Sequence, residues 1–144
     1  MKRYELLHMA FVMHLHQRHT SEAFTREGLN RSWPWILDYL ADGHDGCIQR
    51  ELSRHSHFDP ASITAALVGM EEDGLIRREN AEGDKRALNV YLTEKGMEKQ
   101  KKVQQILSET EEKALRGFTR EECSQLGHML QRIHENLENE DGES

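Results

Sequence analysis

The sequence predicts a mainly α-helical fold that carries one small β-hairpin, in the arrangement called a winged helix-turn-helix. Three observations favour this fold. Apolar residues recur three and four positions apart through much of the 144-residue chain, as they do along one face of a helix. Asp59-Pro60 supplies a capping acid followed by proline at the first helical position. After that helix, two strand-like segments at 75–78 and 88–92 flank a polar turn.

The N-terminal part of the chain is predicted to begin with a helix over about residues 3–23. A wide apolar stripe at helical spacing supports it, and a loop with Gly28 and Asn30 follows at 24–31. The residues that define the stripe are Tyr4, Leu7, Phe11, Val12, Met13 and Leu15.

Two shorter helices are predicted next. Ser32 is placed to cap the first of them, whose opening turn holds Trp33, Pro34 and Trp35. That helix ends at the turn-rich run 41–46, which contains two glycines. The second short helix spans 48–55, with Leu52 as its inward anchor.

The central helix runs from Pro60 to the Asp73-Gly74 turn. It carries Ile63, Leu67 and Met70 at positions i, i+4 and i+7, so one face is predicted to be buried. The polar segment 79–86 contains one glycine and is predicted to form the tip of the hairpin.

Two longer helices are predicted to complete the chain. Thr93 caps the first, and Phe118-Thr119 breaks it. Thr119 and Glu122 match a capping box, in which each residue satisfies the other's backbone N–H. The last helix extends to about residue 138, with an apolar face formed by Leu126, Met129, Leu130, Ile133 and Leu137.

Length and composition indicate one domain with a modest core. Hydrophobic residues make up 36% of the chain and charged residues 31%, so burying surface against a second copy would stabilise it. No stretch approaches the roughly 18 apolar residues of a membrane span, and the N-terminus lacks signal-peptide features. Cys47 and Cys123 lie far apart, which fits a reducing cytoplasm.

The net charge of −7 owes much to the C-terminal end. Residues 134–144 carry five acids and no base, so the rest of the chain has 19 basic against 21 acidic side chains. Residues 139–144 are predicted to be an acidic disordered tail. This balance argues against a broad, nonspecific nucleic-acid binder, although a few cations placed locally can still contact DNA.

The order helix, turn, helix, strand, charged tip, strand suggests how the domain would meet DNA. A helix held by its apolar face can enter a major groove, which is about 12 Å wide. The hairpin tip can then reach a minor groove with Lys85 or Arg86. The alternative is a small α+β domain whose hairpin tip is a solvated turn. Winged helices also serve as protein-interaction modules, so the pattern by itself does not establish DNA binding.

Three motifs in this region resemble the MarR (multiple antibiotic resistance regulator) family. They are the run Glu71–Arg78 (EEDGLIRR), the wing triplet Asp84–Arg86 followed by Ala87, and the run Leu92–Gly96 (LTEKG). The flanking helices match in placement, so the resemblance covers nearly the whole chain. It implies a homodimeric DNA-binding transcription regulator, in many members a repressor that releases DNA when a small, often phenolic, anion binds.

The resemblance also implies how the chain is organised. Residues 1–31 and 93–138 would form the helical dimerisation region, and 32–92 the DNA-binding lobe. Arg86 would contact the minor groove, with Asp84 holding the wing or its arginine in place. The full set of expected DNA-binding residues is Arg54, His55, Pro60, Ala61, Ser62, Thr64, Ala65, Asp84, Lys85 and Arg86. The expected operator is double-stranded and pseudo-palindromic.

One departure from the family concerns the recognition helix. Members often carry arginine near its middle, but this chain has Thr64-Ala65-Ala66 there and no Lys or Arg between Asp59 and Gly74. Guanine reading by an arginine on this helix is therefore excluded, and we expect modest affinity with a shallow salt dependence. A second hypothesis follows from the same feature, a MarR-like protein–protein module with weak or lost DNA binding.

The resemblance further implies an effector site beside the second helix, for a small aromatic or anionic ligand. Trp33 and Trp35 could stack on it, and His14 and Arg18 could supply donor or cationic groups. The alternative is that both indoles belong to the core.

Other chemistries find little support. The nine histidines show no i, i+4 pair within the first helix, so no metal site is predicted. Cys123 lies in the first turn of the last helix, where it is either a thiol of lowered pKa or a small interface residue. No catalytic residue or cofactor is expected, because no nucleophile–base pair or glycine-rich phosphate loop is present, so the chain is not predicted to be an enzyme.

Overall fold

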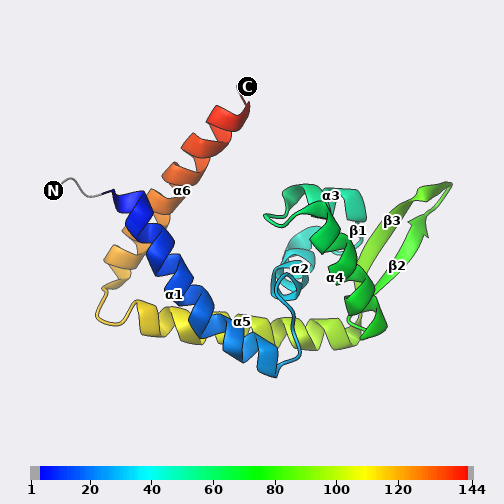
Figure 1. Ribbon diagram of the computed structural model, residues 1–144, viewed down its shortest axis with the longest axis horizontal. Coiled ribbons are helices and arrows are strands. Elements are labelled where there is room, and N and C mark those ends of the chain that lie inside the picture. Colours follow the sequence, from blue (N-terminus) through cyan, green and yellow to red (C-terminus); the bar gives the residue numbers. More distant parts are fainter. Residues whose placement is uncertain (1–3, 143–144) are drawn as a thin grey trace. The chain divides into compact units, whose positions relative to one another are not determined.

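The computed structural model describes residues 4–142, and for Ala81, Asp84 and Lys85 it describes the backbone alone. The chain divides into two compact units, one ending at Thr110 and one beginning at Glu111. The elements, in chain order (Figure 1), are α1 (Glu5–Arg26), α2 (Trp33–Tyr39), a π-helical turn (Leu40–His44), β1 (Cys47–Ile48), α3 (Gln49–His55), α4 (Pro60–Glu72), β2 (Ile76–Ala81), β3 (Asp84–Leu92), α5 (Glu94–Ala114) and α6 (Arg120–Gly142).

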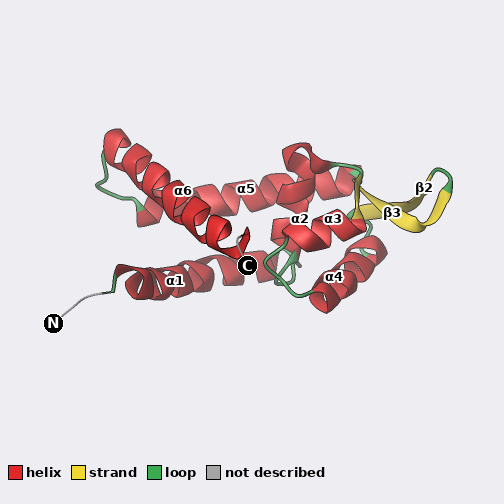
Figure 2. Ribbon diagram, turned by 90° about the horizontal axis from the view of Figure 1, so that it is seen from above, coloured by secondary structure: helices red, strands yellow, loops and turns green. Residues whose placement is uncertain are grey.

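The first unit contains the predicted winged helix-turn-helix. Its three strands pair antiparallel in the order β1-β3-β2, with Cys47 opposite Val90 and Ile76 opposite Leu92. Figure 2 shows β2 and β3 projecting beyond the helices as a two-stranded ribbon. The described lobe therefore has a wing beside α4, as the order of elements predicted.

The strands differ from the prediction in two ways. β1 was not predicted, and β2 and β3 extend through most of the segment 79–86, so the turn itself is Glu82–Gly83. The reason is physical. A ribbon that projects into solvent has water on both faces, so its strands carry no apolar alternation to distinguish them from a loop. Gly83 adopts φ +80°, the left-handed conformation that such a tight turn requires.

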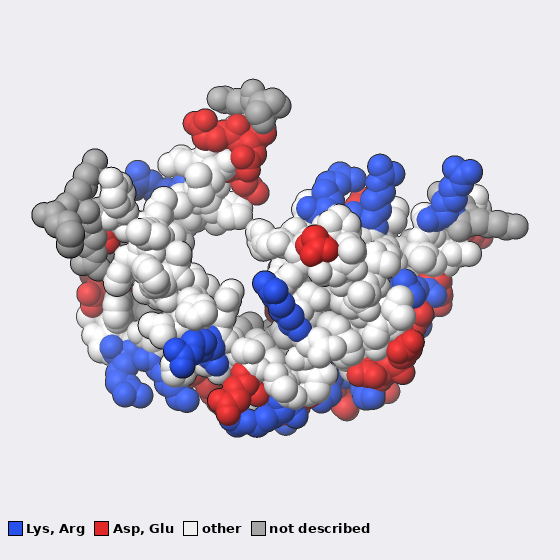
Figure 3. Space-filling view, viewed as in Figure 1, with Lys and Arg blue, Asp and Glu red and all other residues white. Residues whose placement is uncertain are grey.

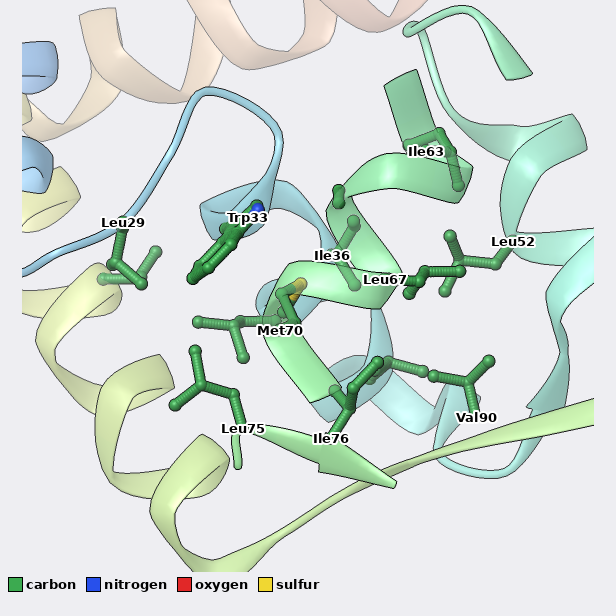
Figure 4. Close-up of a cluster of buried hydrophobic side chains, with 14 residues drawn as sticks. Leu29, Trp33, Ile36, Leu52, Ile63, Leu67, Met70, Leu75, Ile76 and Val90 are labelled. Atoms are coloured by element: carbon green, nitrogen blue, oxygen red, sulfur yellow. The ribbon is translucent and has the colours of Figure 1, made fainter. Parts of the chain in front are cut away.

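The core of the first unit lies between α2, α3, α4, the sheet and α5. Figure 4 shows its side chains converging from these elements. Trp33 is 6% exposed and lies against Gly69, where an added Cβ would come within 2.7 Å of the indole. The buried apolar residues are Leu29, Trp33, Ile36, Leu37, Leu40, Leu52, Ile63, Ala66, Leu67, Met70, Leu75, Ile76, Val90 and Val103.

α4 follows its predicted pattern closely. Asp59 is the N-cap, and its carboxylate accepts a hydrogen bond from the Ser62 backbone N–H at 2.9 Å. Ile63, Leu67 and Met70 are fully buried, as their spacing predicted. The helix is thereby fixed along one face while its other face remains in solvent.

The run Thr93–Gly96 joins α5 to the turn that follows α4. The Thr93 hydroxyl donates to the Gly74 carbonyl at 2.6 Å and accepts from the Gly96 N–H at 3.0 Å. Lys95 Nζ donates to the Asp73 carbonyl at 2.6 Å. Thr93 caps α5 as predicted, and the same hydroxyl anchors the base of the wing.

Three local expectations are wrong. α1 continues to Arg26, beyond the predicted end near residue 23. Ser32 stands at the N-cap of α2 but makes no capping bond, because its backbone is in the αR region rather than the extended conformation of a capping residue. The tail predicted from 139 onward is helical through Gly142, since residues 139–141 contain no proline or glycine; residues 143–144 lie outside the described part.

The second unit consists of the end of α5 and α6. The capping box is present: the Glu122 carboxylate accepts from the Thr119 N–H at 2.9 Å, and the Thr119 hydroxyl accepts from the Glu122 N–H at 3.1 Å. None of the described residues of α6 is buried. Across residues 4–142, no helix is both long and apolar enough to cross a membrane.

Candidate nucleic-acid interface

The solvent face of α4 presents short side chains. Its exposed positions include five of the residues expected to contact DNA, while Ile63, Ala66, Leu67 and Met70 hold the opposite face in the core. A face of short side chains lets a helix backbone approach a groove floor closely, and a helix fixed by its core enters with little loss of entropy. The five exposed residues are Pro60, Ala61, Ser62, Thr64 and Ala65.

The two hydroxyls on this face already donate within the helix. Ser62 Oγ donates to the Asp59 carboxylate at 2.7 Å, and Thr64 Oγ1 donates to the Pro60 carbonyl at 2.9 Å. Each hydroxyl oxygen can still accept a hydrogen bond, and the amino groups of adenine and cytosine in the major groove are suitable donors. Hydrogen bonds from the Ser62 hydroxyl and N–H hold the pKa of Asp59 below its usual range, so the cap stays charged near neutral pH.

Arg54 and His55 are exposed at the C-terminal end of α3, close to the start of α4 in sequence. The His55 ring lies 6.1 Å from the Tyr39 ring, which itself stacks between Trp35 at 4.9 Å and His44 at 4.0 Å. This aromatic stack links α2, the π-helical turn and α3 on the surface of the lobe. It was not predicted, because sequence spacing gives no sign that the two histidines meet one tyrosine.

The wing contributes Arg86, which is exposed and lies within β3 rather than in a loop as expected. The backbones of Asp84 and Lys85 open the same strand, and their side chains lie outside the described part of the structure. The register passes from Asn80 opposite Leu88 to Ala81 opposite Asp84, so Arg86 lies at an irregularity in the β2–β3 pairing near the tip of the wing.

Arg78 braces the wing against α4. Its guanidinium donates to both carboxylate oxygens of Glu71 at 3.1 and 3.3 Å and to Gln49 Oε1 at 3.2 Å. The bond from Arg78 holds the pKa of Glu71 below its usual range. This role was not predicted from the sequence, although side chains alternate between the two faces of a strand and so place Arg78 and Arg77 on opposite faces. Arg77 pairs with Glu79 and lies 4.3 Å over the Tyr91 ring.

Charge is unevenly distributed over the lobe. Residues 47–92 hold six Lys and Arg against eight Asp and Glu, which would suggest an unfavourable surface for DNA. Figure 3 shows the basic side chains gathered along the edge formed by α3 and the wing. Acidic residues instead cluster at the C-terminal end of α4, where Glu71, Glu72 and Asp73 are exposed. The charge near the expected DNA face is more positive than the sum over the lobe suggests.

The four residues expected around an effector differ in their surroundings. Trp33 is part of the core, and Trp35 is half-buried against Tyr39. His14 and Arg18 are exposed on α1. Trp33 is therefore a core residue, and Trp35 packs against the core while remaining partly exposed.

The described residues give little support for a metal site or a reactive thiol. No group of three or more His, Cys, Asp or Glu side chains within residues 4–142 is placed to hold a metal ion. Cys47 and Cys123 are both half-buried. Burial raises the pKa of the Cys47 thiol, and the nearby Glu51 carboxylate adds to the effect, so this thiol is less nucleophilic than an exposed one.

Comparison with known sequences places the chain among bacterial regulators. The sequence model of the MarR family matches residues 27–87, which span the helix-turn-helix and the start of the wing. The transcriptional repressor IacR of Pseudomonas putida is 30% identical over 104 residues, which cover 72% of this chain and 60% of IacR. The chain thus spans under two thirds of that relative. The regulator BilQ of Clostridium symbiosum is 30% identical over 75% of this chain and 74% of its own length.

Solved structures agree on the fold. A MarR-family regulator from Listeria monocytogenes, complexed with a 26mer DNA, matches with a TM-score of 0.85 and 22% identity, covering 97% of this chain and 92% of that one. The organohalide-sensing regulator RdhR, bound to 2,4-dichlorophenol, matches with a TM-score of 0.77 and 23% identity, covering 91% and 78%. With the motifs, the lobe and the two relatives in agreement, the chain belongs to the MarR family of winged helix-turn-helix transcription regulators.

Proposed function

We propose that the chain is a homodimeric, ligand-responsive transcription regulator that acts as a repressor by binding DNA. The observation that carries the proposal is the division of α4 into a fully buried face and an exposed face of short side chains beside the wing. The DNA bound to the Listeria relative, and the repressor function of IacR, support the same assignment by family.

In this proposal α4 enters the major groove at its N-terminal half, and Arg86 on β3 reaches the adjacent minor groove. Ser62 and Thr64 accept hydrogen bonds from bases, and the methyl group of Ala65 packs against thymine. Arg54 contacts the backbone from α3. Since α4 carries no Lys or Arg, most of the electrostatic attraction comes from its neighbours, and the salt dependence is correspondingly shallow.

The homodimer is supported by apolar surface that a single chain leaves uncovered. On α1, Leu7 is 60% exposed and Phe11 64%, and Met129 and Leu137 on α6 are 51% and 59% exposed. Patches of this kind mark interaction surfaces in soluble domains. A second copy that covers α1 and α6 would bury them, and it would set two α4 helices about 34–36 Å apart, one turn of DNA.

Ligand response is proposed by family, with a small aromatic or anionic effector. RdhR binds 2,4-dichlorophenol. Trp35 offers a half-buried indole on α2, the helix that follows α1 in the chain. Such a ligand regulates only through its different affinity for the DNA-competent and DNA-released states. Replacing Trp35 with Ala should then abolish a ligand-induced change in tryptophan fluorescence, and an unchanged response would remove the indole from the site.

The test is fluorescence anisotropy of the purified protein with DNA from its own upstream region and with a scrambled duplex, at several salt concentrations. Arg86→Ala should weaken binding to the native duplex by roughly ten- to a hundredfold, as expected for the loss of a charge-assisted contact. Arg116→Ala, an exposed arginine in the second unit, is the matched control and should bind as the unaltered protein does.

A second candidate is a MarR-like protein–protein module that no longer reads DNA. It is favoured by the absence of Lys and Arg on α4 and by Val68, which is 42% exposed on the same helix. Equal, weak binding to both duplexes with no effect of Arg86→Ala would select this candidate. Preferential binding to the native duplex would exclude it.

A further inference from the structure

A small hollow lies where the segment before α2 meets the turn between α3 and α4. Its volume is about 200 Å³, and it is lined by Arg31, Ser32, His57, Phe58, Asp59 and Ser62. None of the first three was expected to contact a ligand or DNA. The hollow therefore adds residues from a part of the chain that the predicted interface did not use.

Ser32 is the unusual member of this lining. The residue is only 6% exposed, yet its hydroxyl makes no hydrogen bond to any described residue. Its oxygen is not sealed from solvent, and Ser32 is one of the residues that line the hollow. The hydroxyl of a residue buried to this degree normally has a hydrogen-bond partner. A ligand that accepts a hydrogen bond would supply the missing partner.

Arg31 supplies the charge. Its guanidinium carbon lies 5.9 Å from the centre of the Phe58 ring, which supports the side chain from below. Arg31 forms no ion pair within the described part of the chain. A guanidinium held on an aromatic face keeps its donors available, and its planar fork suits the oxygens of phosphate and carboxylate groups.

The Asp59 carboxylate at the rim does not cancel this charge locally. One of its oxygens accepts from the Ser62 N–H at 2.9 Å and the other from the Ser62 hydroxyl at 2.7 Å. Both oxygens are thus directed into the first turn of α4, where the helix dipole compensates the negative charge. His57 adds a further donor that is exposed at the same rim.

We propose that this hollow binds an oxyanion of the phosphate type through Arg31 and Ser32. The chemistry fits either a phosphodiester of the DNA backbone or a free anion such as inorganic phosphate. The first source is favoured because the hollow includes the first turn of α4, beside which a strand bordering the major groove would pass. In that form the inference rests on the proposed function and adds a backbone clamp to it.

Salt-dependent DNA binding separates this clamp from base reading. Arg31→Gln should weaken binding to native and scrambled duplexes alike and reduce the slope of log K against log salt by about 0.9, the value for one phosphate. Arg26→Ala is the control, since that arginine is exposed on α1 and paired with Glu22 at 3.2 Å, and it should leave the slope unchanged.

Ser32→Ala provides the sharper variant. Because the hydroxyl has no partner in the free protein, removing it should leave the melting temperature unchanged or raise it. DNA binding should nevertheless fall roughly ten- to a hundredfold, as for one lost hydrogen bond to a charged group. A variant that loses stability without losing affinity would show that the hydroxyl serves the fold, and would overturn the proposal.

A titration with inorganic phosphate, without DNA, distinguishes the two sources. A free-anion site predicts that phosphate raises the melting temperature more than chloride at equal ionic strength, and that Arg31→Gln removes the excess. A backbone clamp predicts the slope change with no such excess. If the protein binds no DNA but shows the excess, the proposed function fails and the oxyanion site stands. Absence of both effects refutes the site.

Discussion

Replacing Gly96 with alanine tests how tightly α5 packs against the base of the wing. An added Cβ at this position would lie 2.0 Å from the carbonyl oxygen of Leu75 and 3.0 Å from its carbon. The atoms in the way belong to the backbone of Leu75, so the clash cannot be relieved by rotating a side chain. α5 would have to move by about 1 Å, away from the hydrogen bonds that Thr93 makes to Gly74 and Leu75.

The cost can be bounded from these contacts. Overpacking of a close-packed site costs about 1–3 kcal/mol, and each weakened hydrogen bond about 1 kcal/mol. Alanine returns up to about 1 kcal/mol through its higher helix propensity. The net loss is about 3 kcal/mol, which lowers the melting temperature of a chain of this length by roughly 10 °C.

Urea and thermal unfolding followed by circular dichroism measure this loss. Gly127→Ala is the matched control, because that glycine lies within α6 and an added Cβ there meets nothing within 4 Å. It should gain up to about 1 kcal/mol from helix propensity alone. If Gly96→Ala is as stable as the unaltered protein, the close approach of α5 to Leu75 is wrong, and so is the account of how the wing is anchored.

Three further predictions follow from other contacts. The pKa of Glu71 is held below its ordinary value of 4.5 by Arg78, so the stabilisation present above that pH should be lost as the pH falls below it, and urea unfolding against pH should show Glu71→Gln converging on the unaltered protein in acid. Ala65→Arg should tighten DNA binding and raise the salt slope by about 0.9 in anisotropy titrations, whereas arginine at the buried Ala66 should unfold the lobe. Thr119→Ala should cost about 1 kcal/mol in unfolding of the helix that it caps.

The elements that sequence predicted best are those with a local chemical signal. Asp59-Pro60, the spacing of Ile63 and Leu67, and the Thr119 capping box each encode their structure within a few residues, and each is present. Such signals report one helix or one cap at a time. For that reason they located α4 and the start of α6 without any knowledge of what packs against them.

The elements that were missed depend on partners far away in the chain. β1 is two residues long and exists because Cys47 pairs with Val90, some forty positions later. Ser32 is a residue type that commonly caps helices, but its backbone lies in the αR region, and its neighbour Trp33 is packed in the core against Gly69. Tertiary contacts override local preference at such positions, and one sequence does not reveal them.

The candidate site shows the same division. Its exposed α4 residues could be predicted, because they are what remains of the helix once Ile63, Leu67 and Met70 are buried. The brace formed by Arg78 could not, and neither could the hollow that residues 31–32 line together with residues 57–62, since each joins segments separated by at least seven positions. The pattern of residue types along a sequence identifies the face of a helix more readily than it identifies a concave site formed by distant segments.

The charge pattern explains how an acidic chain could bind DNA at all. Counted over the whole chain, the net charge of −7 would repel a polyanion, and α4 adds no cation of its own. At the scale of a Debye length, about 8–10 Å at physiological salt, only the charges near the interface matter, and the acids on the far end of α4 are largely screened. The cations at the interface then come from α3, the wing and Arg31, which surround α4 rather than lie on it. Such a helix would read bases by fit and hydrogen bonding, while its surroundings provide the attraction. Adding a cation to α4 itself should therefore raise affinity for all sequences and lower the preference for the native one.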